Sequence, residues 1–396
     1  MSTLIMNKNK IIIPVILILS LMTGMLLGGV LLTKYFGFSK NSPNPNLMPV
    51  SNAEQNQKVS EDRQTAITKA ISKVSSSIVG INVEEVRTVQ DPFFNDPFFR
   101  QFFGDVGPQK QVVRGLGSGY LISDDGYILT NDHVAGNATK ISVTLTTGET
   151  VEAKLIGSDP ATDVALLKID KNNLPYITLG NSDNVIIGEW VIALGNPFGL
   201  FEINDKPTVT VGVVSALNMK VSAEGNRVYK DMIQTDASIN AGNSGGPLVN
   251  VDGDVIGMNT IIYTGSQFSQ GSIGVGFAIA VNRVKQTMQE LKDKGKIDRN
   301  FNVGFRVQAI DDQIAKYIGL KSKDGVIVTQ VQKGSIADDA GLKPEDVIIA
   351  VNDEKIRNQQ DLIFAINDKK VGDTVKLKII RTGSEQELSM KLKENK

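Results

Sequence analysis

The chain begins with a long apolar segment. Residues Ile11 to Thr33 contain no charged side chain and directly follow Lys8 and Lys10. A helix of this length spans about 35 Å, enough to cross the hydrocarbon core of a bilayer. A cleaved signal peptide has a shorter apolar region and a small-x-small cleavage site, and it fits this pattern less well. The pattern predicts a transmembrane anchor over residues 11–33, with residues 1–10 in the cytoplasm and the remainder outside.

A polar stretch then separates this anchor from the rest of the chain. Residues Asn41 to Ser60 are dominated by Asn, Pro and Ser and show no periodic apolar positions. This composition is typical of a flexible linker, which we place over residues 34–62.

From residue 63 the pattern changes to short alternating or β-branched runs broken by glycine turns. Asp125-Gly126 and Asp252-Gly253 lie between such runs, as hairpins require. Many short strands at this spacing predict antiparallel barrels or a sandwich. The predicted strands are Ile78–Val83, Gly117–Ile122, Ile141–Thr146, Val164–Ile169, Val191–Gly195, Val209–Ser215, Val255–Thr260 and Val275–Ala280.

The period changes again near residue 281. Val281, Val284, Met288 and Leu291 recur at helical spacing, and Gly295 provides a stop signal. We therefore predict a helix that connects two domains and whose end occupies residues 286–296. The remaining residues form a second unit, with strands near Gly325–Val331, Val347–Val351 and Thr374–Ile380 and helices near Gln313–Tyr317 and Gln359–Asn367.

Composition narrows the chemistry. The formal net charge is -1, and acidic and basic residues are interspersed, which argues against nucleic acid as a partner. The absence of cysteine excludes disulfides, thiolate zinc sites and cysteine nucleophiles. A single histidine excludes a zinc site of the H-E-x-x-H type, which needs two. We expect no metal and no cofactor.

Three polar residues form the strongest catalytic pattern. Ser244 lies in "INAGNSGGPL", the only histidine, His133, follows an apolar run, and Asp163 directly precedes one. Each alone has a structural explanation, as a glycine-rich turn, a packing histidine or a cap. Together, in the order His, Asp, Ser, they favour a serine nucleophile with a base and an orienting acid. The amides of Gly242 and Ser244 are placed to form an oxyanion hole.

From about residue 65 to 390 the chain resembles the HtrA/Deg (Do-type) family of cell-envelope serine endoproteases. The similarity lies in "GLGSGYLISDDGYILTNDHV", "GSDPATDVALLKI", "GEWVIALGNPFGL" and "IQTDASINAGNSGGPLVNVDGDVIGMNT". It implies a mainly β fold, with a trypsin-like double antiparallel β-barrel over residues 63–285 followed by a PDZ domain over residues 297–393. It further implies that His133 is the general base, Asp163 its orienter and Ser244 the nucleophile of an acyl-enzyme mechanism.

One residue beside the base departs from the family pattern. Asp132 stands where the family often has Asn. Adjacent side chains on an extended segment point apart, so we do not expect Asp132 to replace Asp163. The effect of Asp132 stays open.

The substrate pocket is the next inference from the resemblance. In trypsin-like folds the positions five or six before the nucleophile line the main pocket, which here are Ser238 and Ile239, with Asn259, Thr260 and Ile261 as a wall. No aspartate lies there to pair with a basic substrate side chain. We expect a preference for small or branched apolar residues.

Residues 91–111 contain the repeated motif Asp-Pro-Phe-Phe. Pro92, Pro97 and Pro108 argue against the alternative of a buried aromatic hairpin. The family carries a mobile loop at this position that gates the active site and joins subunits. We expect the same here, because exposed aromatic side chains mark interaction surfaces.

The C-terminal unit resembles a PDZ domain. In "FNVGF" the backbone amides of Val303, Gly304 and Phe305 would bind the carboxylate of a peptide C-terminus. The alternative is a small αβ domain that only packs on the protease. A single such unit favours the anchored, single-PDZ members of the family as the better comparison.

Together these features predict an ATP-independent serine endopeptidase anchored in the bacterial inner membrane, with its domains on the periplasmic side. Its expected partners are unfolded or misfolded proteins, C-terminal peptides at the PDZ domain, and further copies of itself in a homotrimer or higher oligomer. Two alternatives stay open: a regulatory protease that cuts one membrane signalling protein, and a chaperone or binding protein with vestigial protease activity.

Overall fold

The computed structural model describes residues 64–89, 109–196, 201, 206–221, 227–240, 242–262, 272–320 and 322–395. The predicted anchor over residues 11–33, the linker and most of the loop over residues 91–111 lie outside these described residues. Within the described ranges, no helix combines the length and the apolar character needed to cross a bilayer.

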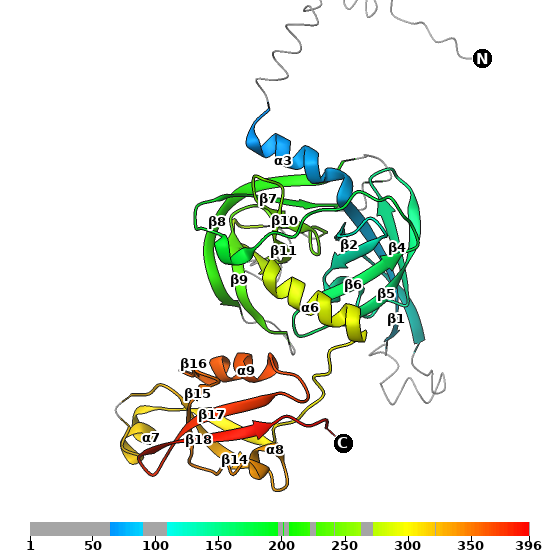
Figure 1. The fold of residues 1–396 in the computed structure, drawn as a ribbon. Coiled ribbons are helices and arrows are strands. Elements are labelled where there is room, and N and C mark those ends of the chain that lie inside the picture. The colour runs from blue at the N-terminus through cyan, green and yellow to red at the C-terminus, as the bar shows by residue number, and fades with distance from the viewer. Residues whose placement is uncertain are drawn as a thin grey trace, which may run out of the picture. The chain divides into compact units, whose positions relative to one another are not determined.

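The first six strands of the described chain form a closed antiparallel barrel (Figure 1). Its strands pair in the order β1-β2-β3-β6-β5-β4. Alternate side chains of one strand enter different cores, because side chains along a strand point to opposite faces. In β6, Ala165 and Leu167 pack inside this barrel, whereas Val164 and Leu166 join a second cluster shared with the next barrel. The strands are β1 (Ile78–Val89), β2 (Gln109–Leu121), β3 (Tyr127–Thr130), β4 (Lys140–Leu145), β5 (Thr150–Asp159) and β6 (Val164–Ile169).

A second closed barrel follows, with the strand order β10-β11-β12-β9-β8-β7. Val191, Val214, Ile233 and Leu248 are fully or almost fully buried inside it. The expected double barrel is thus confirmed, and the sandwich alternative is wrong. The strands are β7 (Trp190–Gly195), β8 (Thr208–Val221), β9 (Tyr229–Thr235), β10 (Pro247–Val249), β11 (Val255–Ile262) and β12 (Gly276–Ala280).

Helices connect and cover the barrels (Figure 1). α6 (Val281–Lys294) begins directly after β12, packs on β5, β6 and β11, and ends at Gly295 with φ 72°. This left-handed conformation favours glycine at a helix C-terminus. The remaining helical segments of this region are α3 (Ala66–Val74), η1 (Ser75–Ser77), α5 (Asp132–Ala135) and η3 (Ser182–Asn184).

The C-terminal unit has a sheet in the order β13-β14-β15-β17-β18, with β16 paired to β15. Val326, Ile348, Leu362 and Leu377 belong to its own core. β13 and β18 were missed by the sequence pattern because most of their side chains are exposed or half-buried. The elements are β13 (Phe305–Ala309), α7 (Asp312–Tyr317), β14 (Val326–Val331), α8 (Ile336–Asp339), β15 (Val347–Val351), β16 (Glu354–Lys355), α9 (Gln359–Asn367), β17 (Thr374–Arg381) and β18 (Ser384–Lys391).

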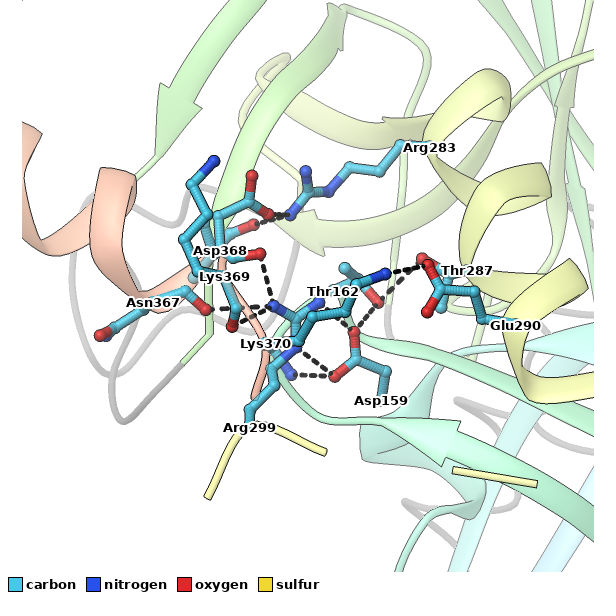
Figure 2. A network of polar contacts seen from close by, with 12 residues as sticks. Asp159, Thr162, Arg283, Thr287, Glu290, Arg299, Asn367, Asp368, Lys369 and Lys370 are labelled. Carbon is cyan, nitrogen blue, oxygen red and sulfur yellow. Dashed lines mark hydrogen bonds and ion pairs between the residues drawn. The ribbon is translucent and has the colours of Figure 1, made fainter. Parts of the chain in front are cut away.

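Charged side chains join the C-terminal unit to the barrels. Figure 2 shows Arg299 between Asp159 and the end of α9. Its guanidinium donates to both carboxylate oxygens of Asp159 at 2.9 and 2.8 Å, and to the carbonyl of Asp368 at 2.6 Å. Asp368 in turn pairs with Arg283 at 2.7 Å and with Lys230 at 2.8 Å. Arg299 thereby satisfies a carbonyl just past α9, which has no partner within the helix.

Candidate active site

The loop that holds Ser244 is anchored to the first barrel through Ser118 in β2. The Ser118 backbone amide donates to the Ser244 carbonyl at 2.9 Å, and its hydroxyl donates to the Gly242 carbonyl at 2.5 Å. The amide of Asn196, directly after β7, donates to the same hydroxyl at 2.7 Å. Ser118 therefore connects both barrels to the candidate nucleophile.

Glycine is required beside Ser244. Gly245 has φ 83°, and a Cβ there would lie 2.2 Å from the Ser118 carbonyl oxygen and 2.3 Å from the Thr130 hydroxyl. Gly242 has φ 97°. Both residues occupy backbone conformations that a side chain disfavours, and Gly245 also has no room for one.

His133 lies in the short helix α5, and its ring contacts Asp163. The ring Nδ1 is 2.8 Å from Asp163 Oδ2, and the His133 backbone amide donates to Oδ1 at 3.0 Å. Because an ionised carboxylate only accepts hydrogen bonds, Nδ1 carries the proton and Nε2 is left as the basic atom. The segment was expected to be extended at Asp132, but it is helical there, since Asp132 is the first residue of α5.

Asp163 is fully buried and held by further donors. Thr260 donates to its Oδ2 at 2.7 Å and Tyr229 at 2.8 Å. Asp163 has φ 59°, and its carbonyl accepts from the Asn131 side chain at 2.9 Å. This left-handed turn aims the carboxylate at α5 instead of into the following strand.

The buried carboxylate is kept ionised by these donors. Burial alone would raise the pKa of Asp163, but hydrogen bonds from His133 and Thr260 outweigh it and hold that pKa below its usual range. Burial and the neighbouring Asp163 charge raise the pKa of Tyr229, so its hydroxyl remains a donor. The arrangement orients the imidazole and places an ionised carboxylate beside it.

His133 and Ser244 open into one cavity of about 270 Å³. The Ser244 hydroxyl donates to the Thr260 carbonyl at 3.1 Å, so it must rotate to give its proton to an imidazole. The cavity is lined by Val83, Glu85, Val113, Gly115, Leu116, His133, Val134, Gly242 and Ser244.

The residues expected to form the specificity pocket are mostly inside the barrel. Ile239 and Asn259 are fully buried, and the Asn259 side chain donates to the Pro247 carbonyl at 3.1 Å. Thr260 directs its hydroxyl to Asp163, a role that was not expected from the sequence. Ser238 is half-buried, and the side chain of Ile261 lies outside the described residues. The pocket stays a prediction.

The predicted peptide-binding loop of the C-terminal unit precedes β13. Gly304 has φ 76°, and its amide donates to the Asn302 side chain at 3.0 Å. The Val303 carbonyl accepts from the Ala337 amide at 3.0 Å, and Phe305 begins β13. Carboxylate binding by Val303, Gly304 and Phe305 also stays a prediction.

Sequence reasoning missed Ser118, Tyr229 and Arg227, and it assigned Thr260 to the pocket wall and not to Asp163. Ser118 had a visible signal, because it lies between two glycines in a predicted strand. Tyr229 and Arg227 had none, since β9 and the segment before it are far from α5 in the sequence.

Comparison with known proteins shows the family. A model of the trypsin-like peptidase domain matches residues 117–258, and a PDZ domain model matches residues 287–392. A probable periplasmic serine endoprotease DegP-like from Hahella chejuensis is 40% identical over 340 residues, covering 82% of this chain and 69% of that protein. The protein of the same description from Chlamydia muridarum is 44% identical over 308 residues; the match covers 76% of this chain and 59% of that protein's length.

Solved structures agree with these relatives. The HtrA-type protease AlgW with decapeptide is 35% identical, with a TM-score of 0.65, covering 84% of this chain and 99% of that one. The serine endoprotease from Yersinia pestis is 29% identical, with a TM-score of 0.58 over 84% of this chain and 99% of that one. This chain therefore belongs to the HtrA/DegP-like family of trypsin-like serine endoproteases with a PDZ domain.

Proposed function

We propose that this chain is an ATP-independent serine endopeptidase that uses His133, Asp163 and Ser244 as its catalytic triad. The observation that carries the proposal is the buried Asp163 carboxylate, which contacts the His133 ring at 2.8 Å in a site that opens to Ser244. A carboxylate, an imidazole and a hydroxyl in this order are the parts of a serine nucleophile and its base.

The reaction would proceed in two steps. His133 Nε2 takes the Ser244 proton as Oγ attacks the scissile carbonyl, and the resulting imidazolium is stabilised by Asp163. The imidazolium then gives its proton to the leaving amine, which leaves an acyl-enzyme for water to hydrolyse. The amides of Gly242 and Ser244 would stabilise each oxyanion, and one such donor contributes about 3 kcal/mol.

The substrates we propose are unfolded or misfolded proteins of the cell envelope. The relatives are described as periplasmic endoproteases, which supports an extracytoplasmic location for the barrels. The apolar segment at residues 11–33 would anchor them to the inner membrane. Association into a trimer or a higher oligomer is part of the same proposal.

We further infer that a peptide at the PDZ domain regulates cleavage. Phe364 of α9 is buried against Val228 and Ala161 of the barrels, and the Val228 amide donates to the Ala161 carbonyl at 2.7 Å. Ala161 is two residues before Asp163. Val228 is adjacent to Tyr229, whose hydroxyl donates a hydrogen bond to the Asp163 carboxylate. Phe364 of α9 therefore contacts both the segment that contains Asp163 and the segment that carries its donor Tyr229. Movement of α9 would shift these segments and change the position of the Asp163 carboxylate.

The test is digestion of unfolded casein by the wild-type chain and by Ser244→Ala, with and without peptides that end in apolar residues. We expect cleavage by the wild type, stimulation by the peptides, and no cleavage by Ser244→Ala. A matched control is Ser384→Ala at an exposed position of β18. Equal cleavage by Ser244→Ala would refute the triad, and cleavage only after Lys or Arg would refute the apolar pocket.

A further inference from the structure

Arg227 is a cation beside the candidate triad that the mechanism above does not use. Its Nε lies 3.5 Å from Asp163 Oδ1, and its Nη2 lies 3.6 Å from Asp132 Oδ2. The Nε atom is buried and has no hydrogen-bond partner among the described residues. One guanidinium thus faces two carboxylates that both lie close to His133.

The contact between Arg227 and Asp163 acts through charge. The Asp163 carboxylate already accepts from the His133 amide and ring, the Thr260 hydroxyl and the Tyr229 hydroxyl. The His133 ring, Thr260 and Tyr229 contacts lie on Oδ2, and Oδ1 accepts from the His133 amide and lies 3.0 Å from the ring Nδ1. At 3.5 Å and without hydrogen-bond geometry, Arg227 adds positive charge and no further hydrogen bond.

The second carboxylate explains why a cation is needed. Asp132 is 6% exposed and belongs to the same helical turn as His133. Burial raises the pKa of Asp132, a hydrogen bond from Ser158 lowers it, the charge of Asp163 raises it further, and the charge of Arg227 opposes that rise. The two carboxylates repel each other, and a cation beside both of them offsets part of that repulsion.

We propose that Arg227 is a positioning residue whose charge offsets part of the negative charge of Asp132 and Asp163 and thereby sets the net charge against which His133 exchanges its proton. The proposal rests on the proposed function for its effect on catalysis. It also gives Asp132, the residue that departs from the family pattern, a partner within the chain.

The direction of the effect follows from the groups around the imidazole. The described charged or titratable groups that face it are Asp132, Asp163, Arg227 and Tyr229, with Glu85 on the cavity wall. Without Arg227 the two carboxylates stabilise the imidazolium more strongly. The acid limb of the kcat/KM profile should then move to higher pH.

The experiment compares the full chain with R227Q, D132N and the double variant, by kcat/KM on a fluorogenic peptide between pH 5 and 9. We expect R227Q to move the acid limb up by about half a pH unit or more. D132N alone should move it down, and D132N in the R227Q background should return it toward the wild-type position. A packing role for Arg227 would not produce this rescue, because the Asn side chain adds no volume.

The single histidine gives a second readout that is independent of activity. His133 can be followed by NMR in every variant without assignment ambiguity, since the chain has one histidine. The titration midpoint of its ring should move as the activity profile does, and R227K, which retains the charge, should resemble the wild type. K154Q, which removes an exposed cation from β5, should move neither.

Each outcome decides one proposal. Shifted NMR midpoints in a chain that does not cleave peptide would overturn the proposed function and leave the charge role of Arg227 intact. An R227Q midpoint equal to that of the wild type, or a D132N change that adds to the R227Q shift instead of offsetting it, would overturn the role of Arg227. If R227Q does not fold, D132N alone decides: an unmoved midpoint counts against the proposal.

Discussion

The ion pairs of Asp368, directly after α9, should make the stability of the contact between α9 and the barrels depend on pH. Its carboxylate is paired with Arg283 at 2.7 Å (Figure 2). It is also paired with Lys230 at 2.8 Å, and its side chain is 14% exposed. Burial alone would raise the pKa of Asp368, but the charge of Arg283 and the hydrogen bonds from Lys230 and Arg283 lower it to about 2. The free carboxylate has the ordinary value of 3.8.

The sign and size of the effect follow from this shift. A folded-state pKa below the unfolded-state value contributes stability that is present above about pH 4 and is lost as pH falls through about 2. The difference of nearly two units corresponds to about 2 kcal/mol at neutral pH, at about 1.4 kcal/mol per unit. The same linkage reduces the contribution to roughly half by pH 3.

The perturbation is Asp368→Asn, made in a Ser244→Ala background so that self-cleavage does not interfere. We expect it to lower the free energy of unfolding by about 2 kcal/mol at pH 7. The difference in the free energy of unfolding between the chains with and without Asp368→Asn should decrease steadily toward pH 3. Urea unfolding followed by the fluorescence of the single tryptophan, Trp190, measures both quantities.

A matched control is Asp312→Asn, whose exposed carboxylate pairs with Lys323 at 3.2 Å. Exposed ion pairs contribute little, so this variant should unfold close to the wild-type midpoint. If Asp368→Asn loses no stability at pH 7, or if its loss is the same at pH 7 and pH 3, the electrostatic reasoning is refuted.

Three further changes test the site and its coupling to the PDZ domain. Tyr229→Phe removes one donor to Asp163 and should lower kcat about tenfold with little change in KM, because hydrogen bonds to charged groups contribute about 1.5–3 kcal/mol; an unchanged kcat would contradict the network. Gly245→Ala should abolish labelling by a fluorophosphonate, since its Cβ would lie 2.2 Å from a backbone oxygen of β2, whereas Gly383→Ala, at φ 79° in open space, should label normally. Phe364→Ala should destabilise the contact with the barrels by about 3 kcal/mol and change both basal cleavage and its response to peptide; a change in stability alone would argue against coupling.

The fold was largely predictable wherever one face of an element is buried. β6 and α6 matched their predicted bounds closely, because their apolar positions repeat at strand and helix spacing. β5 was missed, since Glu152 and Lys154 point to solvent and break the apolar run. The C-terminal strand β18 was missed for the same reason.

The candidate site, like the fold, was predictable only in part. The residue types and the order of His133, Asp163 and Ser244 were visible in the sequence, as was the need for glycine beside the serine. The helical turn at Asp132 was predicted incorrectly as extended, because the run of Thr130 to His133 carries no helical period. The sequence alone also placed Thr260 in the pocket wall, where the structure turns its hydroxyl to Asp163.

The sequence by itself indicated the strands with continuous apolar runs, the connecting helix, the candidate triad and the family resemblance, because each depends on residue type and local spacing. Only the tertiary structure decided which distant groups surround Asp163. Ser118, Arg227 and Tyr229 reach the site from β2, from the segment before β9 and from β9 itself, and Asp159 meets Arg299 across 140 positions of sequence. Contacts of this kind are set by how the barrels close and pack, and local patterns carry no information about that geometry.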